Sequence, residues 1–374
     1  STYLSNETIW FKGYVIDKIT KKPMLETTNV YVNLLNDKFE TIQSNLILAN
    51  LGLFDGFIEP TDTLESGKYY IHTYTNFMNN FDEDESSMFS IEIISVDNPV
   101  IKNYETKLEN TSIEIVVEGG NFVTDCEHKI GVLVKDCFGN GIKRDNIKVL
   151  NQENKEITLF STNQHGYGSF KLFNAKNQLY RVILENESIY IEKKLPVAIE
   201  SGIVMNVSNH LFDKNFIRID LKTNEKNFSK VKNKKYYLAI QKNENLNLVE
   251  VEFANLKNQL LIEKESLHEG INYIRLIDND NNLISERVLY NHVNYTTKID
   301  FQNLTKKNDT IIVRGKMAKE SNLSITMLSN ENTNSFDNHS IASSLQINNY
   351  LNNPIINCYY YLKNYDRIKQ FELD

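Results

Sequence analysis

The sequence contains few of the residues that staple small domains together or build reactive centres. Only three of its 374 residues are cysteine, Cys126, Cys137 and Cys358, and no two of them have the Cys-x-x-Cys spacing of metal and redox sites. Three thiols are too few for a disulfide framework. Two buried free thiols are the commoner outcome for Cys126 and Cys137, and a disulfide across a hairpin is the alternative.

Glycine and proline are also scarce, with 14 and 5 residues, so we expect no long disordered linkers. No stretch approaches the ~20 consecutive apolar residues that a membrane-spanning helix needs. The first residues, Ser1–Leu4, do not resemble a signal peptide and include no cysteine that could accept a lipid. We therefore expect any export signal or lipid anchor to lie upstream of Ser1.

Basic residues are not in excess. The net charge is −8, the sequence pI is about 5.5, and the lysines are scattered instead of clustered. The lack of a basic stripe argues against a nucleic-acid partner and against direct binding to an anionic membrane surface.

Motifs that carry chemistry are missing as well. The seven histidines show neither His-x-His nor His-Glu-x-x-His spacing, which argues against zinc. The stretch 278–282 begins like a calcium loop, but Leu283 and Leu289 stand where that loop needs glycine and glutamate. Residues 166–170 lack the Gly-x-Ser-x-Gly order of a nucleophile elbow, and no glycine-rich phosphate loop occurs. We predict no catalytic residue, no metal ion and no cofactor.

What the chain does contain is a series of short β-stretches. They are rich in valine, isoleucine, tyrosine, phenylalanine and threonine, they alternate with a partial period of two, and they recur roughly every ten residues. No stretch shows a convincing amphipathic helix with caps. This pattern predicts an all-β protein of tandem β-sandwiches and not βαβ units. The predicted strands are 8–17, 29–35, 68–75, 89–96, 112–120, 129–141, 179–185, 216–222, 235–242 and 271–278.

Completed sets of strands end near Asp97, near Glu200 and near Asn291, which divides the chain into four parts. We expect a β-sandwich in each part. The first could lack its N-terminal strand, and the last is shorter than the others and could be incomplete. The predicted domains are 1–98, 99–201, 202–293 and 294–374.

Six sequence motifs follow one another along the chain. They are IWFKGY (9–14), SGKYYIHTYTNFMNNF (66–81), VEGGNFV (117–123), NQHGYGSFKL (163–172), the hairpin 268–292 and the segment 335–362. In this order they resemble the MG2-type, macroglobulin-like domains of outer-membrane-associated proteins of Gram-negative bacteria. Phe77 and Val117 replace the tryptophan and proline that are usual there. The matching residues include Trp10, Phe11, Gly13, Tyr74, Asn76, Met78, Phe81, Gly119, Gly120, Gly166, Gly168, Glu286 and Arg287.

The resemblance implies macroglobulin-like or immunoglobulin-like sandwiches outside the cytoplasm, at the periplasmic or cell-surface face of the outer membrane. Members of the family often continue into a carboxypeptidase-regulatory-like domain and a plug domain of TonB-dependent receptors. The implied partners are subunits of β-barrel or secretion complexes, with membrane association through them or through an upstream lipid anchor. None of the three cysteines lies in the Cys-Gly-Glu-Gln thioester motif of covalent protease traps.

Three functions fit this sequence. The first is a non-enzymatic scaffold or accessory of an outer-membrane transport, secretion or barrel-assembly complex. The second is capture of a glycan or peptide for a TonB-dependent transporter, with Tyr359, Tyr360 and Tyr361 as an aromatic platform. For that triplet we favour the alternative of an edge strand packed on the fourth domain. The third is non-covalent protease inhibition, for which no long bait loop is evident.

Several residues carry structural expectations. We expect Trp10, Phe11, Tyr14, Tyr70 and Tyr74 to fill much of the first core, since each aromatic side chain buries roughly 150–250 Å². The asparagines after Thr75 suit a turn that ends in a packed aromatic corner, and a sugar- or ion-binding loop is the alternative. Glu286 and Arg287 suggest an ion pair or hydrogen bonds buried between domains. The Asp-Thr-aliphatic sequences at Thr63 and Thr310 resemble O-glycosylation sites of exported proteins.

Overall fold

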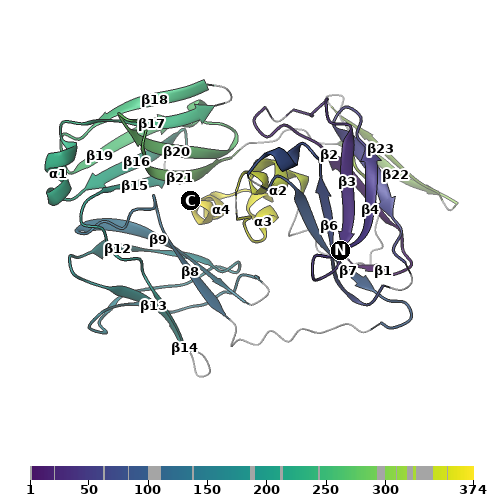
Figure 1. The fold of residues 1–374 in the computed structure, drawn as a ribbon, viewed down its shortest axis with the longest axis horizontal. Helices are drawn as coiled ribbons and strands as arrows, with labels where there is room; N and C mark the ends of the chain where they lie inside the picture. Colours follow the sequence, from purple (N-terminus) through teal and green to yellow (C-terminus); the bar gives the residue numbers. More distant parts are fainter. Residues whose placement is uncertain are drawn as a thin grey trace. The chain divides into compact units, whose positions relative to one another are not determined.

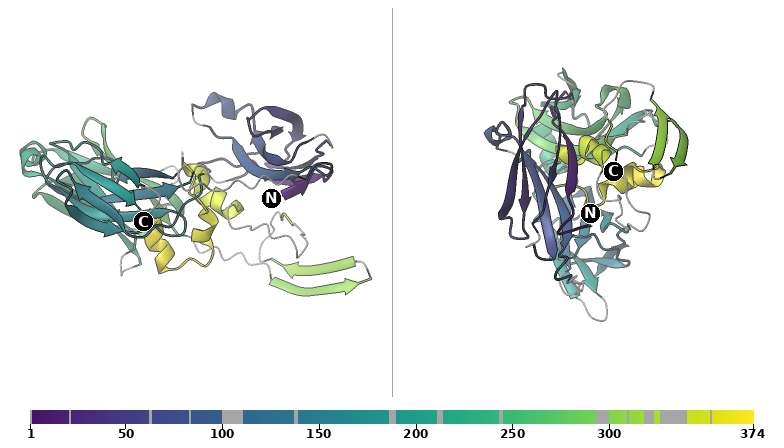
Figure 2. Two further views of the ribbon diagram at one scale, coloured as in Figure 1. Left: turned by 90° about the horizontal axis from the view of Figure 1, so that it is seen from below. Right: turned by 90° about the vertical axis from the view of Figure 1, so that its right-hand side faces the viewer.

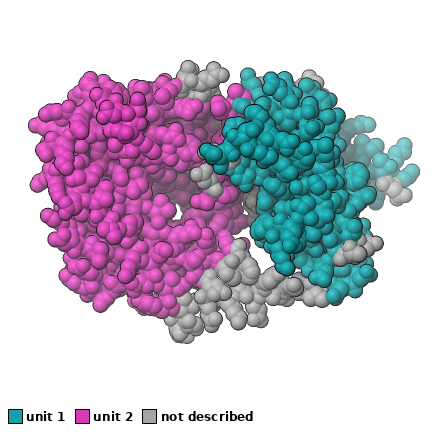
Figure 3. All heavy atoms as spheres, viewed as in Figure 1, with its two compact units in different colours: residues 1–17, 21–102, 292–335 teal, residues 18–20, 103–291, 336–374 magenta. Residues whose placement is uncertain are grey.

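The structure is a computed structural model. It describes residues 2–20, 22–61, 64–82, 84–99, 111–136, 139–185, 190–210, 214–242, 245–292, 300–308, 310–317, 323–325, 340–351 and 353–374. The chain divides into two compact units (Figure 3), of which unit 1 comprises residues 1–17, 21–102 and 292–335. Unit 2 comprises residues 18–20, 103–291 and 336–374.

Unit 1 contains a β-sandwich made of a five-stranded and a two-stranded sheet (Figure 1). The larger sheet, in the order β1-β7-β6-β3-β4, consists of β1 (Thr2–Leu4), β3 (Asn29–Leu35), β4 (Thr41–Leu48), β6 (Gly67–Tyr74) and β7 (Ser87–Ile94). Neighbouring strands in this sheet are antiparallel, except that β1 and β7 pair in parallel. The smaller sheet pairs β2 (Ile9–Tyr14) with β5 (Leu53–Ile58), and the short 3-10 helix η1 (Met78–Asn80) follows β6.

The core between these two sheets is mainly aliphatic, so the prediction of an aromatic core is largely wrong. Strand alternation turns Ile9 and Phe11 inward and leaves Trp10 72% exposed on the opposite face. In β6 the same alternation turns Tyr69 inward, and Tyr70 and Tyr74 outward. The buried core residues are Ile9, Val15, Val30, Val32, Leu34, Ala49, Phe54, Ile58, Leu64, Tyr69, Ile91 and Ile93.

Gly13 has a packing role in this core. It pairs with Phe54 across the two strands, and a Cβ at Gly13 would lie 2.0 Å from the Phe54 ring. The ring therefore occupies the space that any larger residue at this position would need.

Unit 1 also contains the hairpin of β22 (Asp300–Lys307) and β23 (Thr310–Lys316), which forms a narrow two-stranded ribbon (Figure 2). The residues of β23 are all exposed. Thr310, one of the two residues that resemble O-glycosylation sites, is therefore accessible, and Thr63 lies outside the described residues.

Unit 2 begins with a sandwich of two sheets around one core. The sheet β12-β9-β8 consists of β8 (Ser112–Val117), β9 (Cys126–Lys135) and β12 (Tyr167–Asn174). The sheet β11-β10-β13-β14 consists of β10 (Ile147–Asn151), β11 (Glu156–Phe160), β13 (Tyr180–Glu185) and β14 (Tyr190–Lys194). Residues from both sheets, among them Ile130, Val134, Val149, Leu172 and Val182, form the core.

A second sandwich of unit 2 follows directly. Its sheet β15-β16-β19 consists of β15 (Ile203–Ser208), β16 (Phe216–Thr223) and β19 (Lys257–Glu263). Its sheet β18-β17-β20-β21 consists of β17 (Lys235–Lys242), β18 (Asn245–Glu252), β20 (Gly270–Asp278) and β21 (Leu283–Asn291). The helix α1 (Glu225–Val231) and the 3-10 helix η3 (Lys264–Ser266) lie in its connections, and its core includes Met205, Ile219, Leu238, Phe253 and Leu276.

The end of the chain is helical where we expected strands of a fourth sandwich. Its elements are α2 (Ile341–Gln346), η4 (Asn348–Tyr350), α3 (Cys358–Leu362) and α4 (Arg367–Leu373). Ser340 and Asp366 cap α2 and α4 by accepting hydrogen bonds from the backbone of Ser343 and Lys369. The helices are only five to seven residues long, too short for a helical period to show in the sequence.

These helices pack on the two sandwiches of unit 2. The Tyr290 hydroxyl lies 2.6 Å from the Gln346 side-chain oxygen, and Tyr290, Ile347 and Cys358 form a small buried cluster. The chain thus has an all-β architecture of tandem sandwiches with a short helical segment. Within the described residues, no helix is long and apolar enough to cross a membrane.

Candidate binding site

A row of aromatic rings covers the outer face of the five-stranded sheet of unit 1. Tyr31 and Tyr74, directly opposite each other on β3 and β6, stack with ring centroids 5.1 Å apart at 13°. The His72 ring also stacks on the Tyr74 ring, with centroids 5.1 Å apart. The Phe39 ring stacks on the Tyr70 ring, with centroids 4.9 Å apart. We call these five residues the aromatic row. Large aromatic surfaces on a solvent-facing sheet are common in interaction sites.

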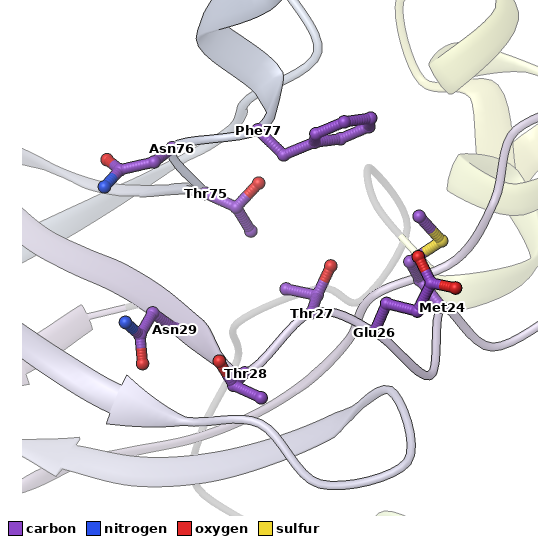
Figure 4. Close-up of a pocket in the computed structure, with 8 residues that line it drawn as sticks. All are labelled: Met24, Glu26, Thr27, Thr28, Asn29, Thr75, Asn76 and Phe77. Carbon is purple, nitrogen blue, oxygen red and sulfur yellow. The ribbon is translucent and has the colours of Figure 1, made fainter.

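A pocket of about 310 Å³ lies where β6 leaves the sheet and β3 enters it (Figure 4). In Figure 4, Phe77 and Met24 lie on one side of the pocket and the asparagines lie on the other. Thr27 and Thr75 lie between these two sides. The lining residues are Met24, Glu26, Thr27, Thr28, Asn29, Thr75, Asn76 and Phe77.

The Asn-rich turn after β6 builds one wall of this pocket. Thr75 is buried, and its backbone N–H donates to the Met78 sulfur at 3.4 Å while its carbonyl accepts from the Met78 N–H at 3.1 Å. The Asn80 side chain donates to the Phe77 carbonyl at 3.0 Å, so the asparagine chemistry of a turn is present as expected. The aromatic corner is not packed, because Phe77 is 55% exposed and Phe81 is 52% exposed.

The opposite wall has unused hydrogen-bonding capacity. Glu26, Thr27, Thr28 and Asn29 make no side-chain hydrogen bond or ion pair to any residue that the structure describes. Asn76 donates to the Tyr31 hydroxyl at 3.3 Å, which joins the pocket to the aromatic row. The sequence offered the stretch that includes Thr75, Asn76 and Phe77 as a sugar- or ion-binding loop, as the alternative to a packed corner, but it singled out none of the residues at 24–29 for binding. The signal that could have found them is the run of hydroxyl and amide residues immediately before β3.

The other motif residues lie in unit 2, where Glu118 and Arg287 form a buried ion pair. The Arg287 Nε lies 3.0 Å from the Glu118 carboxylate, which also accepts from the Val207 N–H at 3.0 Å and from the Asn206 amide at 2.8 Å. Glu118 belongs to the first sandwich of the unit and the other three residues to the second. The pair therefore joins the two sandwiches electrostatically.

The neighbouring glutamate takes a different partner. Glu286 pairs with Arg275 on the adjacent strand at 2.5 Å, in a partly exposed contact. Glu286 and Arg287 therefore do not act together at a domain junction. The glycine motif supports the junction instead: Gly119 has a positive φ of 75°, and its carbonyl accepts from the Ser285 hydroxyl at 2.6 Å.

The tyrosine triplet does not form an exposed platform. It lies in α3, where Tyr361 is 1% exposed and its hydroxyl accepts from the Asn163 amide at 3.2 Å. Tyr360 lies against the His165 ring, with centroids 4.5 Å apart. The open platform and the edge strand are both wrong, because the triplet is helical and the NQHGYG turn at 163–168 covers Tyr361, while Tyr359 and Tyr360 are half-buried.

His165 makes this contact sensitive to pH. Burial lowers its pKa below the ordinary value near 6.5, and the Asn357 amide nitrogen lies 2.9 Å from its Nδ1. Burial also lowers the pKa of His128 in the same sandwich. Neutral rings are therefore favoured in the folded state.

We expect unit 2 to lose stability as the pH falls through about 6.5, because the unfolded chain binds protons at a pH where the folded histidines do not. Urea unfolding followed by hydrogen exchange of residues 163–172 would measure this slope. His165→Gln should make it shallower, whereas His72→Gln in unit 1 is the matched control and should leave it unchanged. Equal slopes in wild type and His165→Gln would contradict the expectation.

The cysteines that the structure describes are buried, and neither is activated. Cys126 and Cys358 are buried free thiols, and burial raises their pKa values to about 11 and about 12, which makes them poor nucleophiles. Cys137 lies outside the described residues, so its pairing stays a prediction. Among the described residues, no group of three or more histidine, cysteine, aspartate or glutamate side chains could hold a metal ion.

With this architecture the chain is an all-β protein of tandem domains, and solved structures of that kind are similar to it. Escherichia coli alpha-2-macroglobulin activated by porcine elastase matches 85% of this chain at 9% identity, with a TM-score of 0.26 and 32% of its own length covered. Dimeric latent PorU from Porphyromonas gingivalis matches 77% at 13% identity, with a TM-score of 0.32 and 31% covered. The E. coli adhesin FdeC matches 76% at 9% identity, with a TM-score of 0.20 and 96% covered.

The chain thus spans about a third of the length of the first two proteins. No protein-family model matches the sequence, and no curated protein matches it. None of the three structural likenesses assigns a function to this chain.

Proposed function

We propose that the chain is a non-enzymatic scaffold that binds other proteins through unit 1. The observation that carries this proposal is the exposure of its single tryptophan. Trp10 is 72% exposed on the outer face of the two-stranded sheet, although tryptophan is costly to leave in water. Tryptophan is also among the residues that most often dominate the binding energy of protein interfaces.

Trp10 belongs to a small interaction surface, which we call the Trp10 patch. Its cross-strand partner is Phe57, 45% exposed, and the two rings lie 5.1 Å apart at 52°. The next outward pair along the strands is Lys12 and Asp55, so charged residues border the aromatic pair. An aromatic centre with a polar rim is the usual composition of a protein interface.

The cellular location and the binding partners of the protein are part of this proposal. They are inferred from the sequence motifs. We place the protein outside the cytoplasm, at the outer membrane, as a subunit or accessory of a transport, secretion or barrel-assembly complex. Its membrane association would run through those partners or through an upstream lipid anchor.

We expect Trp10→Ala to reduce the recovery of partner proteins about tenfold, because loss of a buried aromatic anchor typically costs more than about 1.4 kcal/mol of binding. The measurement is co-purification of the tagged protein from its native envelope in mild detergent, quantified by mass spectrometry. Phe173→Ala, which removes an exposed aromatic ring from unit 2, is the matched control and should retain the partners. Unchanged recovery with a folded Trp10→Ala protein would refute the proposal.

A further inference from the structure

We infer that the pocket in unit 1 binds a neutral glycan, with one sugar ring in the pocket and the chain continuing towards the aromatic row. This goes beyond the scaffold function and rests on different residues. The pocket volume of about 310 Å³ lies at the lower end of the range for small-molecule sites, roughly 300–1,000 Å³. That size suits a single sugar ring better than a large cofactor.

The lining chemistry matches a polyol. Hydroxyl and amide groups, which both donate and accept hydrogen bonds, come from Thr27, Thr28, Asn29 and Thr75. Sugar hydroxyl groups need that dual capacity. At least three of these side chains have no hydrogen-bond partner among the residues that the structure describes, so binding would not have to break an existing contact.

The charge of the lining excludes several other ligands. Among the described residues that line the pocket there is no lysine, arginine or histidine, and Glu26 is the one ionisable residue. A carboxylate without a compensating cation repels phosphate, sulfate and carboxylate groups. The site therefore favours a neutral ligand, and Glu26 can accept hydrogen bonds from its hydroxyl groups.

An apolar side completes the site. The Phe77 ring, more than half exposed, and Met24 lie together on one side of the pocket, opposite the asparagines (Figure 4). The C–H face of a pyranose ring packs against an aromatic ring, while the hydroxyl groups at its edge point to polar partners. The pocket thus has an apolar surface from Phe77 and Met24, with Glu26 beside Met24, opposite the asparagines (Figure 4).

The sheet geometry favours a glycan over a peptide. A peptide bound by strand addition needs a free strand edge, but β3 and β6, which border the pocket, both lie inside the sheet and pair on both sides. The outer face offers side chains only. From Asn29 and Asn76 this face continues along Tyr31 and Tyr74, which gives a ligand chain a path out of the pocket.

The test is isothermal titration calorimetry of the full chain with neutral hexasaccharides, namely cellohexaose, maltohexaose, laminarihexaose and mannohexaose, and with a sulfated heparin hexasaccharide. We expect at least one neutral hexasaccharide to bind and the sulfated one not to. Phe77→Ala should weaken that binding at least tenfold.

Phe81→Ala is the matched control, because Phe81 lies 5.3 Å from Phe77 edge-on and is equally exposed but does not line the pocket. It should leave the affinity unchanged, as should Trp10→Ala, which separates this site from the Trp10 patch. The inference is overturned if no neutral hexasaccharide binds, if the sulfated one binds more tightly, or if Phe77→Ala and Phe81→Ala have equal effects. Both positions are exposed, so both variants should fold, which thermal unfolding can verify.

Discussion

Replacing Gly166 with alanine is expected to destabilise unit 2 by about 3 kcal/mol, the sum of a left-handed backbone and an overlap with neighbouring atoms. The φ angle of Gly166 is +80°, which costs an alanine roughly 1–2 kcal/mol. A Cβ there would lie 2.2 Å from the Val134 carbonyl oxygen and 2.8 Å from the Gly141 Cα. Both neighbours are backbone atoms, so no side chain can rotate away to relieve the overlap.

The turn around Gly166 is also fixed by hydrogen bonds. The Asn163 side chain accepts from the backbone N–H groups of His165 at 2.9 Å and Tyr167 at 3.1 Å, and the Gly166 carbonyl accepts from the Val134 N–H at 2.9 Å. This turn holds α3 through His165. We therefore expect Gly166→Ala to loosen the C-terminal helices as well as the sandwich.

Substitutions at two other glycines separate the cost of the left-handed backbone from the cost of the close contact. Gly120 has a φ of +82° and no atom within 4 Å of its added Cβ, so Gly120→Ala should cost only the backbone term, about 1–2 kcal/mol. Gly131, also in unit 2, has no positive φ, and the one atom near an added Cβ is the Val116 carbonyl oxygen at 3.8 Å, so Gly131→Ala should be nearly neutral. The measurement is urea unfolding followed by hydrogen exchange, because the one tryptophan lies in unit 1 and its fluorescence reports that unit. A Gly166→Ala cost no larger than that of Gly120→Ala would show that the close contact is absent.

Arg287→Met is expected to destabilise unit 2 by about 3 kcal/mol, at the low end of the range for breaking a buried ion pair. It leaves Glu118 charged, with a side chain 5% exposed and, among the residues that the structure describes, only the Val207 N–H and the Asn206 amide as remaining donors. Two hydrogen bonds do not replace an opposite charge beside a carboxylate that is almost completely buried. The Arg287 side chain is 22% exposed, so solvent screens part of the pair and the upper end of the range is not reached.

The control lies on the same sheet. Arg275→Met breaks the more exposed pair with Glu286, and such surface pairs contribute only about 0–1 kcal/mol. The double variant Glu118→Gln/Arg287→Met should recover part of the loss, because it removes the uncompensated charge. Chemical unfolding of the four proteins measures these differences. Equal costs for Arg287→Met and Arg275→Met would mean that the Glu118 pair is solvated.

Much of the fold could be read from local sequence. Alternating β-branched and aromatic residues predicted ten strands, and each of them overlaps a strand of the structure, as 235–242 does in β17. Alternation is a property of the strand itself, because successive side chains point to opposite faces. The helices α2 to α4 were not predicted, because one or two turns are too short to show a helical period in the sequence. Their stability comes from packing on the sandwiches.

The candidate site could be predicted only in fragments. The asparagines after Thr75 predicted a turn, and the side-chain hydrogen bond that Asn80 donates to the Phe77 carbonyl supports that prediction. The residues at 26–29 that face it lie almost fifty positions earlier in the chain, and the two segments meet because β3 pairs with β6. The same holds for Glu118 and Arg287, 169 residues apart.

The sequence by itself determined the all-β class, the positions of ten of the 23 strands that the structure describes, and the alternation of inward and outward residues along them. It did not determine which alternate set faces the core. Aromatic residues occupy outward positions in β2 and β6, and a strand buries whichever face its partner sheet covers. Only the tertiary structure therefore decided that Trp10, Tyr70 and Tyr74 face solvent, that Tyr361 is buried, and that Thr27 and Thr75 share a pocket. Each depends on contacts between segments that are far apart in the chain, and local sequence patterns do not encode them.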